Sequence, residues 1–290
     1  MDRFYRFAGI TFRVTGNEEE MYREEGILLP FRVSGPGFDH SVSYRVVDSL
    51  PRPEGEPVFL GNRTQAFLLG DTQTMCMGDT ARLPEGAHTH IRREGSHSLV
   101  QVLRREVPEG IKPRLVLNTL EAEHHIVRHG GFLLHSSFVQ VAGRAILFTA
   151  PSGTGKSTQS RLWEIYRGAR VINGDRTAVI VEEKGVFAHG IPYCGTSGIS
   201  VNEELPVAAI VYLSQGPESA AVPLTGLRAF RRVWEGCSVH VWNREDVELC
   251  TTPVAEAIRR VPVVHLTCKP DESAVNVLEA YLQERGWLYG

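Results

Sequence analysis

A glycine-rich segment near the middle of the chain, Ser152-Gly153-Thr154-Gly155-Lys156-Ser157, constrains the fold more than any other feature. The apolar run Ala145–Phe148 precedes it and is typical of a buried strand, and the residues from Thr158 onward have a helical pattern. A strand, a glycine-rich turn and a helix in this order form the local structure of a phosphate-binding loop, or P-loop. The sequence therefore predicts a strand–loop–helix unit that binds the phosphates of a nucleotide.

The loop residues have separate roles in this interpretation. Gly153 and Gly155 can adopt backbone angles that other residues avoid, so consecutive N–H groups can point at phosphate oxygens beside the positive end of the helix dipole. We expect Lys156 to reach the outer phosphates and the Ser157 hydroxyl to ligate Mg²⁺. The alternative is a glycine-rich connector that contains a lysine by chance, because Ala150 stands where the pattern normally begins with glycine. The predicted nucleotide-binding residues are Ser152, Gly153, Thr154, Gly155, Lys156, Ser157 and Thr158.

Composition argues against several classes of protein. The 290 residues are 42% hydrophobic and 22% charged, which is typical of globular proteins. The net charge of −3 gives no field that would favour nucleic acid or an anionic membrane, and no apolar run is long enough to span a bilayer. The first residues lack the apolar core of a signal peptide, so we expect a cytoplasmic protein without nucleic-acid or membrane partners. The five cysteines are scattered, without the spacing of a zinc site or a disulfide framework.

The chain is predicted to form two domains. Residues 1–110 are expected to be β-rich, because apolar residues alternate with polar ones, for example at Ile10, Phe12 and Val14. Residues 111–290, in which strand-like and helical patterns alternate around the loop, are expected to form an α/β domain.

A helix is expected over about 115–129, with a cluster of histidines near its end. His125 and His129 are one turn apart, and His88 and His90 would share one face of a strand. Both spacings occur in metal sites, but neither pair has a third ligand at a suitable spacing. We therefore favour solvent-facing histidines over a metal site in both places.

Two further residues are candidates, one in the turn that ends an expected strand and one inside an expected strand before the loop. Asp175 lies in the acidic turn that ends the strand-like segment 169–176, one helix after the loop, where an acid can meet Mg²⁺ or a substrate hydroxyl; the alternative is an ordinary turn residue. His135 ends an apolar run before the loop and would by itself be a structural histidine.

The small residues of segment 189–198 are compatible both with close approach of the backbone to a ligand and with a tight structural loop, and neither interpretation is favoured. His240 and Arg244 are polar candidates for substrate contact, but a surface role is favoured for each.

Three of these features together resemble the catalytic domain of the HPr kinase/phosphorylase family: His135, the loop Ser152–Ser157 and the segment Arg167–Arg176. Members of that family also have a histidine 21 residues before the loop lysine, which is the separation between His135 and Lys156, and a strand that closes on an acidic turn followed by arginine. The resemblance covers roughly residues 130–290. It implies a P-loop kinase domain of the phosphoenolpyruvate-carboxykinase type, with a mixed sheet and with His135 beside the reacting phosphate.

Within this group the chain is most similar to the shorter HPr-kinase-like proteins encoded with peptide-modification pathways. These include kinases that phosphorylate the C-terminal serine of lasso-peptide precursors, and the similar segments are Ile172–Arg176, Gly190–Gly198 and Cys268–Asp271. The chain departs from the family at Gly174, which replaces the first of two acids and leaves Asp175 alone. The segment Gly190–Gly198 also stands where the family has a glutamate-containing signature. These departures count against phosphorylase activity and against HPr as the acceptor.

The leading hypothesis is an ATP- and Mg²⁺-dependent kinase that phosphorylates a serine hydroxyl of a peptide or small protein. The expected catalytic residues are His135, Lys156 and Asp175, and the expected metal ligands are Ser157 and Asp175. Asp175 would orient or deprotonate the acceptor hydroxyl, or hold the metal. Two alternatives stay open: a nucleotide-binding regulator without acceptor chemistry, and a kinase of a small-molecule alcohol. The sequence also leaves open whether the chain forms a homo-oligomer.

Overall fold

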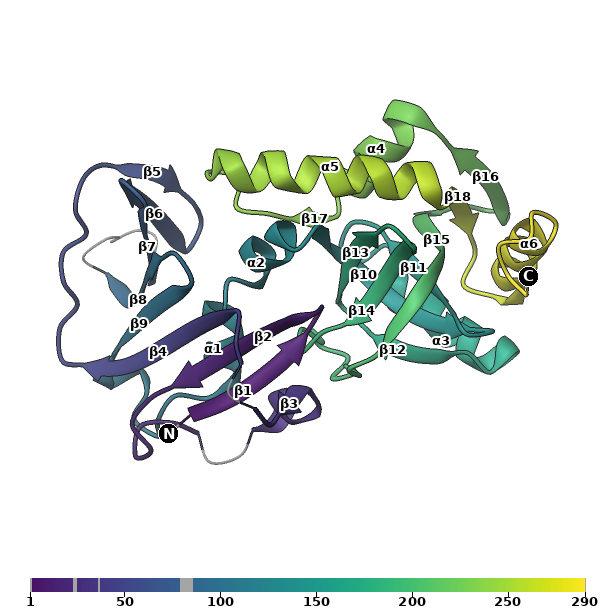
Figure 1. Cartoon of the computed structure of the whole chain (residues 1–290). Coiled ribbons are helices and arrows are strands. Elements are labelled where there is room, and N and C mark those ends of the chain that lie inside the picture. Colours follow the sequence, from purple (N-terminus) through teal and green to yellow (C-terminus); the bar gives the residue numbers. More distant parts are fainter. Residues whose placement is uncertain (1, 23–24, 36, 79–85, 290) are drawn as a thin grey trace. The chain divides into compact units, whose positions relative to one another are not determined.

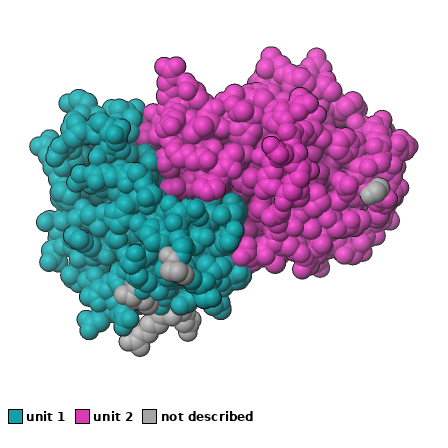
Figure 2. Space-filling view, viewed as in Figure 1, with its two compact units in different colours: residues 1–121 teal, residues 122–290 magenta. Residues whose placement is uncertain are grey.

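The computed structural model describes residues 2–22, 25–35, 37–78 and 86–289 (Figure 1). Two compact units make up the chain, Met1–Glu121 and Ala122–Gly290, which Figure 2 shows in different colours. Each unit contains a mixed sheet, and strands outnumber helices. Among the described residues, no helix has both the length and the apolar character needed to cross a bilayer.

The N-terminal unit is built on one sheet, in the order β3-β1-β2-β4-β9-β8-β7-β6-β5. Its strands are β1 (Asp2–Phe7), β2 (Ile10–Thr15), β3 (Arg32–Val33), β4 (His40–Val47), β5 (Pro57–Leu60), β6 (Thr64–Leu69), β7 (Thr72–Gly78), β8 (Ala87–Glu94) and β9 (His97–Leu103). Strand β4 runs parallel to β2 and β9, and the other pairs are antiparallel. The predicted alternation is confirmed in β2, where Ile10, Phe12 and Val14 are buried and the residues between them are partly exposed. The short helices of this unit are η1 (Gly26–Phe31), η3 (Arg104–Glu106) and α1 (Pro113–Thr119).

The helix expected over about 115–129 is wrong, because the structure has two short helices there. Helix α1 ends at Thr119 and α2 (Ala122–Arg128) follows it, with Glu121 between them in a left-handed conformation at φ 49°. Glu121 is buried, where its carboxylate accepts a hydrogen bond of 2.6 Å from Gln73 Nε2 and lies 3.4 Å from Arg93 Nε. These contacts stabilise the break between α1 and α2. The boundary between the two units lies after Glu121, whereas the sequence analysis expected it after residue 110.

The C-terminal unit contains the second sheet. Its strands are β10 (Gly131–Val141), β11 (Arg144–Thr149), β12 (Arg170–Asn173), β13 (Arg176–Glu182), β14 (Gly185–Gly190), β15 (Glu204–Gln215), β16 (Ala220–Leu224), β17 (Cys237–Ser238) and β18 (Val263–Cys268). Strands β11, β15 and β18 run parallel to one another, and the remaining pairs are antiparallel. The successive pairings β11–β10–β13–β14–β15 return to β11, so these five strands close a ring. The helices besides α2 are α3 (Lys156–Arg167), α4 (Gly226–Trp234), α5 (Arg244–Arg260) and α6 (Glu272–Gln283).

Residues 145–148 of strand β11 are all apolar because both faces of the strand are buried there. Ile146 and Phe148 belong to a hydrophobic cluster with residues of α3 and α6, whereas Ala145 and Leu147 belong to a cluster with residues of α4 and α5. The strand that precedes the glycine-rich loop is therefore fixed from two sides.

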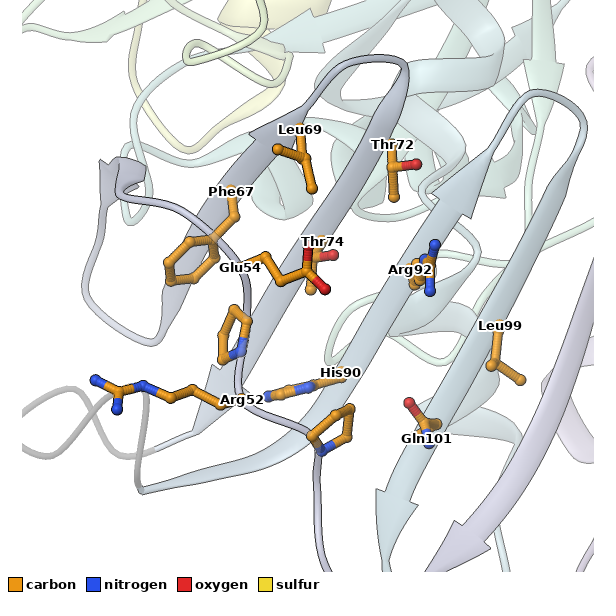
Figure 3. Close-up of a pocket in the computed structure, with 12 residues that line it drawn as sticks. Arg52, Glu54, Phe67, Leu69, Thr72, Thr74, His90, Arg92, Leu99 and Gln101 are labelled. Atoms are coloured by element: carbon orange, nitrogen blue, oxygen red, sulfur yellow. The ribbon is translucent and has the colours of Figure 1, made fainter.

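In the N-terminal unit, His90 on β8 is buried against the sheet. Figure 3 shows the segment 51–54 crossing the face of β6–β9, where His90 lines a cavity of about 160 Å³. Its side chain is 3% exposed, and burial lowers the pKa of His90 from 6.5 to about 4, because the charged imidazolium would lose its hydration.

We expect His90→Gln to reduce the loss of stability on acidification. Between pH 6.5 and 4 the unfolded chain binds a proton at residue 90 that the folded chain does not, so the free energy of unfolding falls as the pH falls through this window. Between pH 7 and pH 4 the wild type should lose roughly 1–3 kcal/mol more than His90→Gln, as measured by urea unfolding. Equal losses in the two proteins would contradict the buried neutral histidine.

Candidate active site

The glycine-rich loop connects the end of β11 to the start of α3, as predicted. The strand ends at Thr149 and the helix begins at Lys156, two residues before Thr158, from which the sequence predicted it. Gly153 and Gly155 have φ angles of 80° and 124°, and a Cβ atom at either would meet open space. The loop therefore has the positive φ angles that only glycine adopts without strain, and its outer face is free for a ligand.

Lys156 folds back over this loop. Its Nζ donates hydrogen bonds to the carbonyl oxygens of Ala150, at 2.9 Å, and of Pro151, at 3.5 Å. The side chain is mostly buried, and this burial lowers the pKa of Lys156, against the opposing influence of the Asp175 carboxylate. An acid and a cation therefore lie close enough to interact at the base of the loop.

Asp175 lies in the turn between β12 and β13, next to His135 on β10. The distance from His135 Nε2 to Asp175 Oδ1 is 3.5 Å, and both side chains are about one-third exposed. The contact with His135 lowers the pKa of Asp175 most, burial opposes this, and Arg176 and Lys156 lower it further. The structure thus brings the three predicted catalytic residues together, with Asp175 favoured as a carboxylate that solvent can reach.

The pairings of β10 produce this arrangement. His135 lies opposite Arg176 in the ladder between β10 and β13, and the N–H of Ser136 donates to the carbonyl oxygen of Asp175 at 3.0 Å. The Thr149 hydroxyl, at the end of β11, donates to the carbonyl oxygen of His135 at 3.0 Å. Strand β10 is therefore hydrogen-bonded both to the acidic turn at Asp175 and to the end of β11 at Thr149.

Asn173 shapes the acidic turn. Its Oδ1 accepts hydrogen bonds from the backbone N–H groups of Asp175, at 2.9 Å, and Arg176, at 3.1 Å, while its Nδ2 donates to the carbonyl oxygen of Ile191 at 2.6 Å. This is an Asx turn that a buried asparagine closes.

The segment 193–198 packs directly on the acidic turn. A Cβ at Gly195 would lie only 2.7 Å from Asp175 Cβ and 3.0 Å from Asp175 Oδ1, and a Cβ at Gly174 would overlap the Ser197 hydroxyl. Ser197 in turn donates to the carbonyl oxygen of Cys194 at 2.6 Å. The Ser197 side chain therefore occupies the space in which a second acid at position 174 would begin.

A second hollow of about 480 Å³ adjoins the start of α3. It lies where the parallel strands β15 and β18 end, a position at which ligands often bind in α/β sheets. Its lining residues are Thr154, Gly155, Thr158, Gln159, Gln215, Gly216, Cys268, Lys269 and Pro270. Gln215 Nε2 donates to the carbonyl oxygen of Thr154 at 3.2 Å, whereas the buried Oε1 of Gln159 has no hydrogen-bond partner among the described residues. The hollow thus adjoins the glycine-rich loop, and the side-chain amides of Gln159 and Gln215 line it.

A protein-family model matches the part of the chain that contains the loop and the acidic turn. This model, described as SynChlorMet cassette protein ScmC, covers residues 114–266, which is just over half of the chain. The chain belongs to the ScmC family. No curated protein matches the sequence. Among solved structures, the HPr(Ser) kinase/phosphatase from Coxiella burnetii is similar, at 13% identity and a TM-score of 0.31, over 53% of this chain and 93% of that chain.

Of the two further polar candidates of this ScmC-family chain, Arg244 lies at the surface as favoured, whereas His240 does not. His240 is buried, and Arg244 is exposed and pairs with Glu248 at 2.7 Å. The solvent-facing interpretation is wrong for His90 and for His125, because both are buried. The sequence missed Asn173, Gln159 and Gln215, since their contacts join segments that no local pattern relates.

We expect Gly195→Ala to destabilise the protein more than Gly198→Ala. The two glycines have similar φ angles, 56° and 69°, so both substitutions carry the same backbone strain, but only a Cβ at Gly195 would collide with Asp175. The additional loss for Gly195→Ala should be about 1–3 kcal/mol in urea unfolding. An equal decrease in the free energy of unfolding for the two variants would contradict this prediction, because segment 193–198 would then move aside to accommodate the added Cβ.

Proposed function

We propose that the chain is an ATP- and Mg²⁺-dependent kinase that transfers the terminal phosphoryl group to a serine hydroxyl of a peptide or small protein. The observation that carries this proposal is the convergence of His135, Lys156 and Asp175 at the base of a glycine-rich loop with an open outer face. Phosphoryl transfer depends on positioning and charge neutralisation, which are what this arrangement supplies.

In the proposed mechanism the loop N–H groups and the N-terminus of α3 bind the phosphates. Lys156 exchanges its bond to the Ala150 carbonyl oxygen for the outer phosphates, which a flexible ammonium group can do without moving the backbone. Ser157, which is exposed, and Asp175 offer the oxygen donors that Mg²⁺ prefers. The metal would supply charge neutralisation at the phosphates.

Asp175 and His135 would act on the acceptor side. Because its pKa is lowered, Asp175 is ionised at neutral pH and can accept a hydrogen bond from the attacking hydroxyl or hold the metal. His135, at 3.5 Å, orients that carboxylate and can donate to the transferred group.

The hollow beside the loop suits the nucleoside half of ATP. It begins at Thr154 and Gly155 of the loop itself, so a nucleotide whose phosphates lie on the loop could extend into it. The amides of Gln159 and Gln215 are suitable partners for the polar edge of a base.

We propose the C-terminal serine of a peptide, such as a lasso-peptide precursor, as the acceptor. The similarity of segments Gly190–Gly198 and Cys268–Asp271 to kinases of that kind supports this choice. The Arg176 guanidinium supports it too, because it lies beside Asp175, is about one-third exposed, and could pair with a terminal carboxylate.

A nucleotide-binding regulator is the second candidate. It is favoured by the loss of one acid, since the Ser197 side chain fills the space beside Gly174. Such a protein would bind ATP at the same loop and transfer nothing.

The two candidates separate in a transfer assay. The full chain is incubated with γ-labelled ATP and Mg²⁺, together with a peptide ending in serine, the same peptide ending in alanine, its C-terminal amide, and small alcohols. Label on the first peptide alone supports the proposal, and label on a small alcohol supports a metabolite kinase. Tight ATP binding without transfer supports the regulator.

We expect Lys156→Ala to reduce turnover by at least about 100-fold, because the transferred phosphate loses its positive partner. Lys184→Ala is the matched control, since Lys184 is an exposed lysine of the same unit that pairs with Glu182 at 3.0 Å. Initial rates of label transfer give the comparison. Near-wild-type transfer by Lys156→Ala would defeat the mechanism.

A further inference from the structure

A buried group of metal-ligand side chains lies in the C-terminal unit, formed by His124, His240 and Asp246. His124 belongs to α2, His240 follows β17, and Asp246 lies in the first turn of α5. Their exposed fractions are 2%, 8% and 0%. We call these three residues the His–Asp cluster.

The distances within the His–Asp cluster are close to those around a single ion. Asp246 Oδ2 lies 2.9 Å from His124 Nδ1 and 3.2 Å from His240 Nδ1, and one ligand atom from each residue lies within 4.8 Å of the others. Tetrahedral zinc with ligands at about 2.0–2.2 Å separates neighbouring ligand atoms by roughly 3.3–3.5 Å. Shifts of a few tenths of an ångström at the two measured pairs would therefore suffice.

His240 is oriented as a metal-binding histidine normally is. Its second ring nitrogen, Nε2, lies 3.3 Å from Glu123 Oε1, and its ring stacks on Trp242 with 4.9 Å between ring centroids. A carboxylate on the outer nitrogen fixes the ring and directs the other nitrogen to the metal. This contact leaves Nδ1 of His240 directed at Asp246.

The charges around the cluster favour an added cation. Asp246, Glu123 and Glu245 are acidic, whereas the nearby cations are Arg128, which is shared between Asp246 and Glu245, and Arg176, which acts on Glu123. Arg128 binds Asp246 through Oδ1, so Oδ2 is left to the histidines. Its Nη1 also lies 3.0 Å from His124 Nδ1, a contact that it must give up if an ion enters; its side chain is 29% exposed and has room to move.

We propose that His124, His240 and Asp246 form a structural zinc site, with Glu123 holding His240 and water as the fourth ligand. Two nitrogen donors select zinc over Mg²⁺, so this site would be distinct from any magnesium at the nucleotide. Its ion would tie α2 and α5 to the segment after β17. That strand contains Ser238, whose hydroxyl accepts a 2.9 Å hydrogen bond from Arg176 beside Asp175.

The test uses the full wild-type chain, freed of metal by a chelator and titrated with Co²⁺ without nucleotide. We expect one equivalent to bind with the intense visible absorption of a tetrahedral site, to be displaced by Zn²⁺, and to raise the melting temperature by several degrees. A chain that remains folded yet gives neither the absorption nor the shift in melting temperature would overturn the proposal.

Variants locate the site. His240→Gln and Asp246→Asn should lose the Co²⁺ absorption, whereas His129→Gln, an exposed histidine at the end of the same α2 segment, should keep it. Loss in His129→Gln with retention in His240→Gln would overturn the assignment. If His240→Gln fails to fold, the stoichiometry and the spectrum of the wild type test the proposal. A His–Asp cluster that is held together only by hydrogen bonds would bind no Co²⁺.

Discussion

The hydrogen bonding of β10 determines where the groups of the candidate active site lie. This strand pairs with β11, β12, β13 and β17, so it borders the start of the glycine-rich loop, the acidic turn and the segment that carries Ser238. A slip of one residue in any of these ladders would turn His135 to the opposite face of the sheet. The juxtaposition of His135 and Asp175 is therefore a property of backbone register and only secondarily of their own contact.

The local parts of the site could be predicted from the sequence. The turn from β11 to α3 depends on an apolar strand, two glycines and a helix, all within one short segment. Asp175 was predicted from the end of a strand and His135 from a resemblance in spacing, and the structure places these residues 3.5 Å apart. Strand alternation in the N-terminal unit was equally readable, because it needs only the period of the side chains.

The remaining features depend on contacts between distant segments. The packing of Gly195 on Asp175, the Asx turn of Asn173 and the hollow beside Gln215 have no periodic pattern. The break at Glu121 was missed for the same reason, since Gln73 and Arg93 hold it from the sheet. The histidines of the 124–129 segment were expected to face solvent, but His124 and His125 are buried, and His124 contacts Asp246 of α5 at 2.9 Å.

The closed ring of five strands has a mechanical consequence. A residue fixed to β10, β11 or β13 cannot move towards a substrate without breaking ladder hydrogen bonds on two sides, because none of these strands has a free neighbour-facing edge within the ring. Adjustment to a substrate is thereby confined to the connectors, above all the glycine-rich loop and segment 193–198. The strands thus keep the geometry of the reacting groups constant, while the connectors around these groups adjust to the substrate.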